Sequence, residues 1–258
     1  MDPGEQAPID TSTSPEEQPR FIQVPWDLNK VFQVMILWVL AFWILGYWII
    51  PLGLGTFGLE REDLTTRGQA LVHLLLDVSE MGVTLGLLWA CLRRYKPLAL
   101  GWFRSWLRPA RRWVPQVLLA LLSFPLVDIV SARSQIWFRH DQDIWGPLEQ
   151  SLSAGDPVTN ALYFVVVTVC APIWEEAIFR GFLLPSLTKY MRVPVAIVAS
   201  AMVFAFAHFS LQRFLPLVLL GIIFGTLFVR TKNLLSSVLL HSFWNMWIFY
   251  CLAMRGGM

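Results

Sequence analysis

Charged residues are scarce in this chain of 258 residues. They make up 15% of the sequence, whereas hydrophobic residues make up 56%, and soluble domains are usually nearer a quarter charged. Apolar windows of about 20 residues recur along the chain, and each is long enough to cross roughly 30 Å of hydrocarbon. The sequence therefore predicts an all-α fold, a polytopic transmembrane helical bundle with about seven to eight spans.

Cysteine is scarce as well, and its three positions, Cys91, Cys170 and Cys251, show neither a disulfide framework nor CxxC spacing. The net charge of +2 and the lack of a basic patch interleaved with aromatic residues argue against a nucleic-acid partner. The first twenty residues lack an apolar run and are acidic, so they resemble neither a secretory signal nor a transit peptide. We interpret residues 1–25 as a disordered N-terminal tail.

Seven stretches of the sequence are candidate spans, and the fourth is long enough for one tilted helix or for a helix followed by a short second element. They are Val31 to Ile50, Gln69 to Leu92, Trp113 to Ala132, Pro157 to Leu187, Val193 to Ser210, Phe214 to Val229 and Leu234 to Met254. We divide them into the N-terminal membrane helices of residues 26–156 and a membrane core of residues 157–258.

The distribution of lysine and arginine predicts the orientation of these spans. If the basic loop of residues 93–112 lies in the cytoplasm, alternation places thirteen Lys and Arg residues inside and six outside, with Arg180 in the membrane. This arrangement puts the N-terminus in the cytoplasm. Within the loop, Leu98 to Pro109 mixes aromatic and basic residues, which fits either an amphipathic interfacial helix or an aromatic-belt loop.

Two adjacent carboxylates and an arginine interrupt the fourth span. A charge at bilayer depth costs at least about 2.5–3.5 kcal/mol, so such residues face a protein interior or a water-filled cavity. Glu176 and Arg180 are four residues apart with the acid first, which is the favourable order for a helical ion pair. Glu175 is rotated by about 100° from Glu176 on a helix, so we expect it to be a free carboxylate beside a structural pair.

Two further polar clusters lie in later spans. Phe204 and His208 are one helical turn apart near the end of an apolar stretch, and His241 and Asn245 are one turn apart in the last span. Both side chains of the second pair can donate hydrogen bonds, so together they could hold an oxygen atom. The alternative for each of these clusters is a structural role in helix packing or interhelical hydrogen bonding, and for Glu175, Glu176 and Arg180 it is a salt-bridge cluster that only fixes helix packing.

A stripe of ionisable residues occupies the second span. His73, Asp77 and Glu80 follow one another at i, i+4 and i+7, and Asp128 adds an acid that we expect to be buried. We interpret the stripe as part of the lining of the same interior cavity, with either a proton path or a purely structural role.

The order and spacing of these motifs resemble a known family. Glu175-Glu176-x-x-x-Arg180, then Phe204-x-x-x-His208, then His241-x-x-x-Asn245 are similar to the three motifs of the CPBP family. This family contains the CAAX prenyl endopeptidases and bacteriocin-processing enzymes, and it is also called the Abi family of intramembrane proteases. The resemblance covers roughly Pro157 to the C-terminus.

The resemblance implies an intramembrane endopeptidase, a membrane-bound hydrolase of the glutamate type. By similarity, Glu175 is the base that activates a water molecule, His208 orients that water, and His241 and Asn245 stabilise the oxyanion. The supporting residues implied are Glu176, Arg180 and Phe204. The implied partners are membrane lipid and a membrane-associated protein or peptide substrate, in a bacterial plasma membrane or an internal membrane such as a thylakoid.

Three alternatives stay open at this point. A zinc site could use Glu175, His208 and His241 with an open fourth position, but the chain lacks an HExxH pair and Asn245 is a poor zinc ligand, so we expect no cofactor. The chain could instead be a non-catalytic scaffold or chaperone with the protease fold. A transporter that uses the stripe as a proton relay is disfavoured because the two halves show no inverted repeat.

The catalytic hypothesis meets one geometric difficulty. Counted from the cytoplasmic ends of their spans, His208 lies about 15 residues up and His241 about 7, which is a difference in depth of some 12 Å on straight helices. Tilt, a broken helix or different span ends must bring the two imidazoles together if they serve one site.

Overall fold

The structure is a computed structural model that describes residues 22, 24–60, 63–96, 109–137 and 155–256. The described residues are helical throughout with short connections and form no strand, which confirms the all-α prediction. The helices are α1 (Leu28–Ile44), α2 (Ile50–Thr56), α3 (Thr66–Leu92), α4 (Val114–Leu121), α5 (Phe124–Trp137), α7 (Pro157–Val165), α8 (Ala171–Glu176), α9 (Leu184–Leu187), α10 (Val193–Phe206), α11 (Leu211–Thr231) and α12 (Leu234–Gly256). Most of the predicted tail, nearly all of the Leu98 to Pro109 segment and most of the acidic loop that follows α5 lie outside the described residues.

Five helical stretches in this part of the chain are long and apolar enough to cross a membrane. They are Leu28–Thr56, Thr66–Tyr95, Pro157–Leu187, Leu211–Thr231 and Leu234–Met254. The helices α4 and α5 pass the same test together as a pair bent by 40°, so the described residues contain five or six spans of this kind. The remaining predicted span corresponds to α10, whose 14 residues are too few. The chain is therefore an integral, multi-pass membrane protein.

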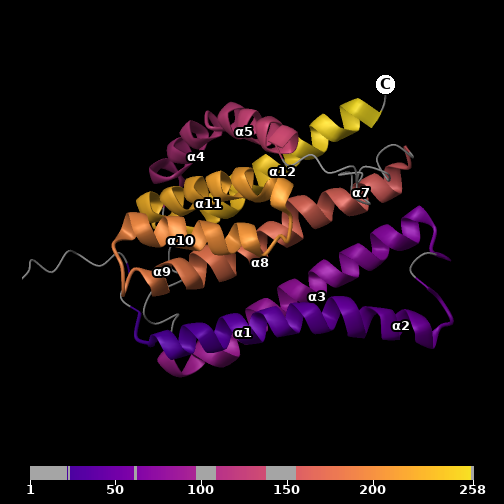
Figure 1. Cartoon of the computed structure of the whole chain (residues 1–258), viewed down its shortest axis with the longest axis horizontal. Coiled ribbons are helices and arrows are strands. Elements are labelled where there is room, and N and C mark those ends of the chain that lie inside the picture. The colour runs from indigo at the N-terminus through magenta and orange to yellow at the C-terminus, as the bar shows by residue number, and fades with distance from the viewer. Residues whose placement is uncertain (1–21, 23, 61–62, 97–108, 138–154, 257–258) are drawn as a thin grey trace, which may run out of the picture.

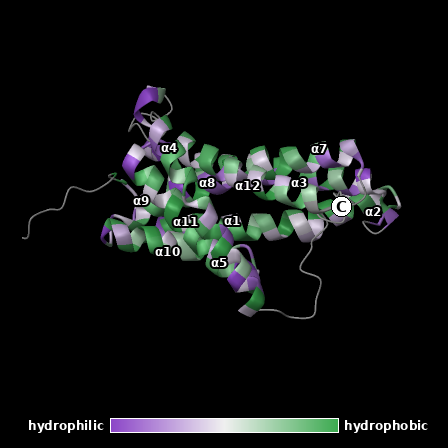
Figure 2. Cartoon of the chain, turned by 90° about the horizontal axis from the view of Figure 1, so that it is seen from above, coloured by the Kyte–Doolittle hydropathy of each residue, from purple (hydrophilic) through white to green (hydrophobic). Residues whose placement is uncertain are grey.

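The stretch Pro157–Leu187 is the centre of the bundle. In the most apolar 18-residue window of this stretch 61% of the residues are buried, against 11% in the corresponding window of Leu28–Thr56. It lies between α1 and α3 on one side and α10, α11 and α12 on the other, with α4 and α5 outermost (Figure 1). Figure 2 shows hydrophobic residues along the lengths of the helices, with much of the hydrophilic colour toward their ends.

The central stretch is one continuous helix in which α-helical and π-helical segments alternate. Its π-helical segments are Val166–Cys170 and Ala177–Leu183, on either side of α8. Pro172 lacks an N–H and so cannot donate to the carbonyl of Thr168, and the turn directly before it is one of the two π-helical segments. Wider turns of this kind are frequent at functional sites, and Glu175 and Glu176 lie between the two.

An ion pair connects the start of the central stretch to α3. Asp156 is the N-cap of α7 and accepts a hydrogen bond from the backbone N–H of Thr159, and its carboxylate also binds Arg67 at 2.7 and 2.9 Å. The guanidinium of Arg67, together with Thr159, holds the pKa of Asp156 well below its usual range. Both residues lie at the end of the bundle where α3 and α7 begin (Figure 1).

The helices α10 and α11 approach each other closely at a glycine. A Cβ atom added to Gly221 would lie 2.7 Å from the Cβ of Ala201 and 2.8 Å from its Cα, so only glycine fits without a shift of the helices. Small residues at such crossings let transmembrane backbones come close enough for van der Waals packing.

We expect Gly221→Ala to destabilise the bundle by about 1–3 kcal/mol, the usual cost of an overpacked contact. Thermal unfolding in detergent should therefore shift to lower temperature. The matched control is Gly82→Ala in α3, where an added Cβ meets nothing within 4 Å and helix propensity favours alanine. A second change, Ala201→Gly, should restore much of the loss in Gly221→Ala. An equal response of the two glycine variants would contradict this account of the packing.

Candidate active site

Glu176 is the most completely bonded polar group of the site. It is fully buried, and its Oε1 accepts hydrogen bonds from Nη1 of Arg180 at 2.8 Å and from Nδ1 of His241 at 3.0 Å. Its Oε2 accepts a hydrogen bond from the hydroxyl of Ser237 at 2.6 Å. The ion pair expected from the spacing of Glu176 and Arg180 is present, and the carboxylate also fixes the ring of His241, which the spacing did not indicate.

The guanidinium of Arg180 is held on its other sides as well. Its Nη2 donates to the carbonyl of Gly221 at 3.3 Å, and its central carbon lies 4.4 Å from the ring centroid of Phe204 and 5.3 Å from that of Phe224. Cation–π contacts of this kind are favourable where the cation is desolvated. The arginine thus has a compensating contact in each direction, which a charge buried inside a membrane protein requires.

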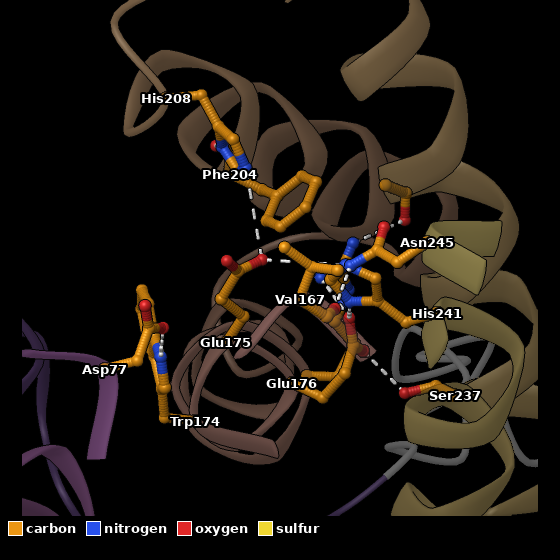
Figure 3. A network of polar contacts seen from close by, with 12 residues as sticks. Asp77, Val167, Trp174, Glu175, Glu176, Phe204, His208, Ser237, His241 and Asn245 are labelled. Atoms are coloured by element: carbon orange, nitrogen blue, oxygen red, sulfur yellow. Dashed lines mark hydrogen bonds and ion pairs between the residues drawn. The ribbon is translucent and has the colours of Figure 1, made fainter. Parts of the chain in front are cut away.

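Glu175 does not share the hydrogen bonds of Glu176 and Arg180, as the helical rotation predicts. Only 8% of the residue is exposed, and its Oε2 makes no hydrogen bond within the described part of the chain. That oxygen lies 4.0 Å from Nε2 of His208 and 3.8 Å from Nε2 of His241. Figure 3 shows Glu175 with the two histidines on one side and Asp77 and Trp174 on the other.

The other nitrogen of each imidazole is already in use. Nδ1 of His208 lies 2.8 Å from the carbonyl oxygen of Phe204, and Nδ1 of His241 faces the Glu176 carboxylate. Since both of these oxygens can only accept, each Nδ1 carries the proton. A neutral His208 ring therefore turns the lone pair of its Nε2 toward Glu175, so this nitrogen and Oε2 of Glu175 are two acceptors that face each other. A water molecule, which donates two hydrogen bonds, matches this pair.

The two histidines meet at Glu175 although the count along straight helices placed them at different depths. The helix α10 ends at Phe206, and His208 lies in the turn that leads into α11, with its side chain 26% exposed. The next residue, Phe209, has a positive φ of 48°, which reverses the chain direction there. His208 is thus set in a turn within the bundle and reaches the same oxygen of Glu175 as His241 on α12.

Asn245 lies one turn beyond His241 on α12 but contacts the backbone. Its amide Nδ2 donates to the carbonyl of Val167 at 2.7 Å, and Val167 belongs to the first π-helical segment of the central stretch. This bond ties α12 to that segment. The described contacts of Asn245 include neither Glu175 nor the two histidines, although its amide carries a second N–H.

The stripe on α3 reaches the site at one point. The indole Nε1 of Trp174, the residue before Glu175, lies 3.4 Å from Oδ1 of Asp77, and the ring of His73 lies 5.4 Å from that of Tyr163. The expectation that Asp128 is a buried acid is wrong. Asp128 is only half-buried and accepts a hydrogen bond from Nε1 of Trp247 at 3.1 Å, because this part of α5 lies at the edge of the bundle.

Sequence reasoning missed three contributors to the site. Ser237 lies one turn before His241, so the same i, i+4 reading could have found it. The ring of Phe224 stacks on that of His241 at 4.9 Å, and an apolar residue in an apolar helix gives no signal of such a role. The carbonyl of Val167 accepts from Asn245 and lies in a π-helical segment. The sequence gives no signal for a π-helical segment at this position.

The alternative zinc set is wider than a compact tetrahedral site. With bonds of 2.0–2.1 Å, neighbouring tetrahedral ligands are about 3.3–3.4 Å apart, whereas Glu175 is 3.8 and 4.0 Å from the two Nε2 atoms. Among the described residues, no group of three or more His, Cys, Asp and Glu side chains is arranged to hold a metal ion.

A bundle of apolar spans around a buried glutamate and two imidazoles defines a polytopic membrane protein with a candidate hydrolytic site. Residues 157–247 match the family model of the type II CAAX prenyl endopeptidases, Rce1-like. This part of the chain is therefore a domain of the CPBP/CAAX protease family, and the match supports an intramembrane protease. Comparison with curated proteins and with solved structures gave no match for the chain.

The two adjacent glutamates should respond differently to the same change. Glu176→Gln removes the counter-charge of a fully buried arginine, and breaking a buried pair in this way costs about 3–5 kcal/mol. Glu175→Gln removes an oxygen that has no donor, so we expect a change within about 1 kcal/mol. Thermal unfolding of the purified variants in detergent measures both effects. Similar losses in the two variants would mean that Glu175 also has a structural partner.

Proposed function

We propose that the protein is an intramembrane endopeptidase in which Glu175 activates a water molecule for peptide-bond hydrolysis. The observation that supports this most strongly is the convergence of one unbonded carboxylate oxygen and two imidazole nitrogens within 4.0 Å. A general base and a means of positioning the nucleophile are what amide hydrolysis requires. The family match of residues 157–247 supports the same reaction class.

In the proposed reaction, a water molecule hydrogen-bonds to Oε2 of Glu175 and to Nε2 of His208. Glu175 takes one proton as the water oxygen bonds to the carbonyl carbon of the scissile peptide, giving a tetrahedral oxyanion. Glu175 then passes that proton to the amide nitrogen, the C–N bond breaks, and a carboxylic acid and an amine leave. The carboxylate is regenerated, so one water molecule is consumed for each bond cut.

His241 is suited to stabilise the oxyanion. Its Nδ1–H is bound to the Glu176 carboxylate, which holds Nε2 toward the site, and in the proposal an N–H at Nε2 donates to the developing charge. The second N–H of Asn245 is the proposed partner donor, in keeping with the resemblance in motif order. Arg180 and Phe204 support these groups through their contacts with Glu176 and His208.

The proposed substrate is a membrane-associated protein or peptide cut near the membrane, in a bilayer that is a bacterial plasma membrane or an internal membrane such as a thylakoid. The N-terminus is proposed to be cytoplasmic on the strength of the Lys and Arg distribution. No metal cofactor is part of this proposal.

Glu175→Gln keeps the size of the side chain and removes the base, so cleavage should fall by at least about 100-fold. Membrane proteomes of cells with the wild type and with Glu175→Gln, at equal abundance, should differ by accumulated uncut precursors in the variant. Asp128→Asn is the control, because it neutralises a carboxylate of another helix. Full retention of the cellular phenotype by Glu175→Gln would instead indicate a scaffold or chaperone.

A glutamate mechanism also predicts indifference to metal removal. Purified wild-type protein should keep its peptidase activity after treatment with a zinc chelator, and it should hold well below one zinc per chain by elemental analysis. Loss of activity on chelation, with recovery on adding zinc and a matching loss of bound zinc in His208→Ala and His241→Ala, would establish the metal-dependent alternative.

A further inference from the structure

One polar stripe of the bundle has no part in the proposed chemistry. His73, Asp77, Glu80 and Thr84 follow one another at i, i+4, i+7 and i+11 along α3, which places them on one face of the helix. This face turns inward: Thr84 is 2% exposed, whereas Leu75 on the opposite face is 56% exposed. Polar residues in a transmembrane helix are costly and mark ion, proton or water paths more often than chance would place them there.

Glu80 lines a small cavity beside this stripe. The residue is only 6% exposed and makes no hydrogen bond within the described part of the chain. The cavity of about 10 Å³ lies between α1 and α3 and is also lined by Thr84 and the apolar side chains Trp38, Ala41, Phe42, Leu45 and Val83. That volume is close to the space one water molecule needs, and two polar side chains are there to bind it.

The stripe leads from this cavity to the proposed base. Asp77 lies one turn before Glu80 and accepts from the indole of Trp174, the residue before Glu175. The carboxyl groups of Asp77 and Glu80 are both near enough to that of Glu175 to interact with it electrostatically. Figure 3 shows Asp77 and Trp174 beside Glu175, on the side away from the histidines.

We propose that the α3 stripe is a water path that supplies Glu175. This inference rests on the proposed function, because hydrolysis consumes one water molecule per bond and the hydrocarbon around the bundle supplies none. Water bound at Glu80 and Thr84 passes Asp77 and the edge of Trp174 to reach the carboxylate. The competing path enters past His208, whose side chain is 26% exposed.

Silver ion tests the path directly, because it is small, reacts with thiols and enters membrane proteins only through water. The background is a variant with Cys91, Cys170 and Cys251 replaced by alanine, to which Thr84→Cys or Leu75→Cys is added. Membranes are treated with silver, the protein is then unfolded, and the thiols that silver has not blocked are labelled with a maleimide. We expect silver to block maleimide labelling in Thr84→Cys and not in Leu75→Cys. This is the opposite of the order expected from surface exposure, because Thr84 is buried and Leu75 is exposed. An unprotected thiol at position 84 would overturn the proposal.

Activity gives the second measurement. Glu80→Leu and Asp77→Leu should lower kcat about tenfold while KM for a peptide substrate stays the same, and Glu80→Gln should recover much of the loss because an amide still binds water. Asp128→Leu is the matched control, since it breaks a similar carboxylate–indole pair, with Trp247, away from the site. Unchanged kcat in both leucine variants of the stripe would show that water enters past His208.

The two proposals can fail separately. Adding Glu175→Gln to Thr84→Cys should abolish cleavage and leave silver protection intact, because the path does not depend on the base. Protection at position 84 in a protein that never cleaves peptides would keep the hydrated stripe and reject the protease. Cleavage that depends on Glu175 without protection at position 84 would keep the protease and reject the stripe as its water path.

Discussion

A single buried carboxylate, Glu176, holds the centre of this bundle together. Its three hydrogen bonds reach Arg180 on its own stretch and Ser237 and His241 on α12, and Arg180 extends the network to the backbone of α11. A charge at this depth is tolerated only when it is fully compensated. Because Glu176 takes up the available donors, Glu175 next to it is left with an oxygen that none of them reaches.

Packing and chemistry are coupled at the crossing of α10 and α11. The contact of Ala201 with Gly221 sets the distance between these helices, and the same glycine supplies the carbonyl bound by Arg180. Phe204 of α10 lies over the guanidinium and its carbonyl fixes the ring of His208. A shift of α10 would therefore move the imidazole of His208 and the guanidinium of Arg180 together. The small side chain of Ala201, which packs on Gly221, thus helps to position both groups.

Local rules predicted much of this arrangement, and long-range geometry accounts for the rest. The four-residue spacing was sufficient to pair Glu176 with Arg180 and to separate Glu175 from them, because both effects depend on one helix alone. The meeting of His208 with His241 could not be derived, since it depends on how separate helices are arranged around Glu175 and not on the sequence of any one of them. The burial of Asp128 was predicted wrongly for a related reason. Whether a helix lies at the edge or in the centre of a bundle cannot be inferred from the sequence of that helix alone.

Among the described residues, Glu175 has a buried oxygen without a hydrogen-bond donor, and Glu80 on the adjacent α3 is 6% exposed in largely apolar surroundings. Burying a carboxyl group in this way costs stability, and packing alone does not explain it. Natural sequences concentrate such costly groups where function requires them. For the proposed hydrolase the requirement is specific, since Glu175 as the base needs an unoccupied oxygen and the substrate water needs polar atoms along its way. Under this proposal, an apolar α3 would give a tighter bundle but would leave Glu175 dependent on the turn at His208 alone for its water.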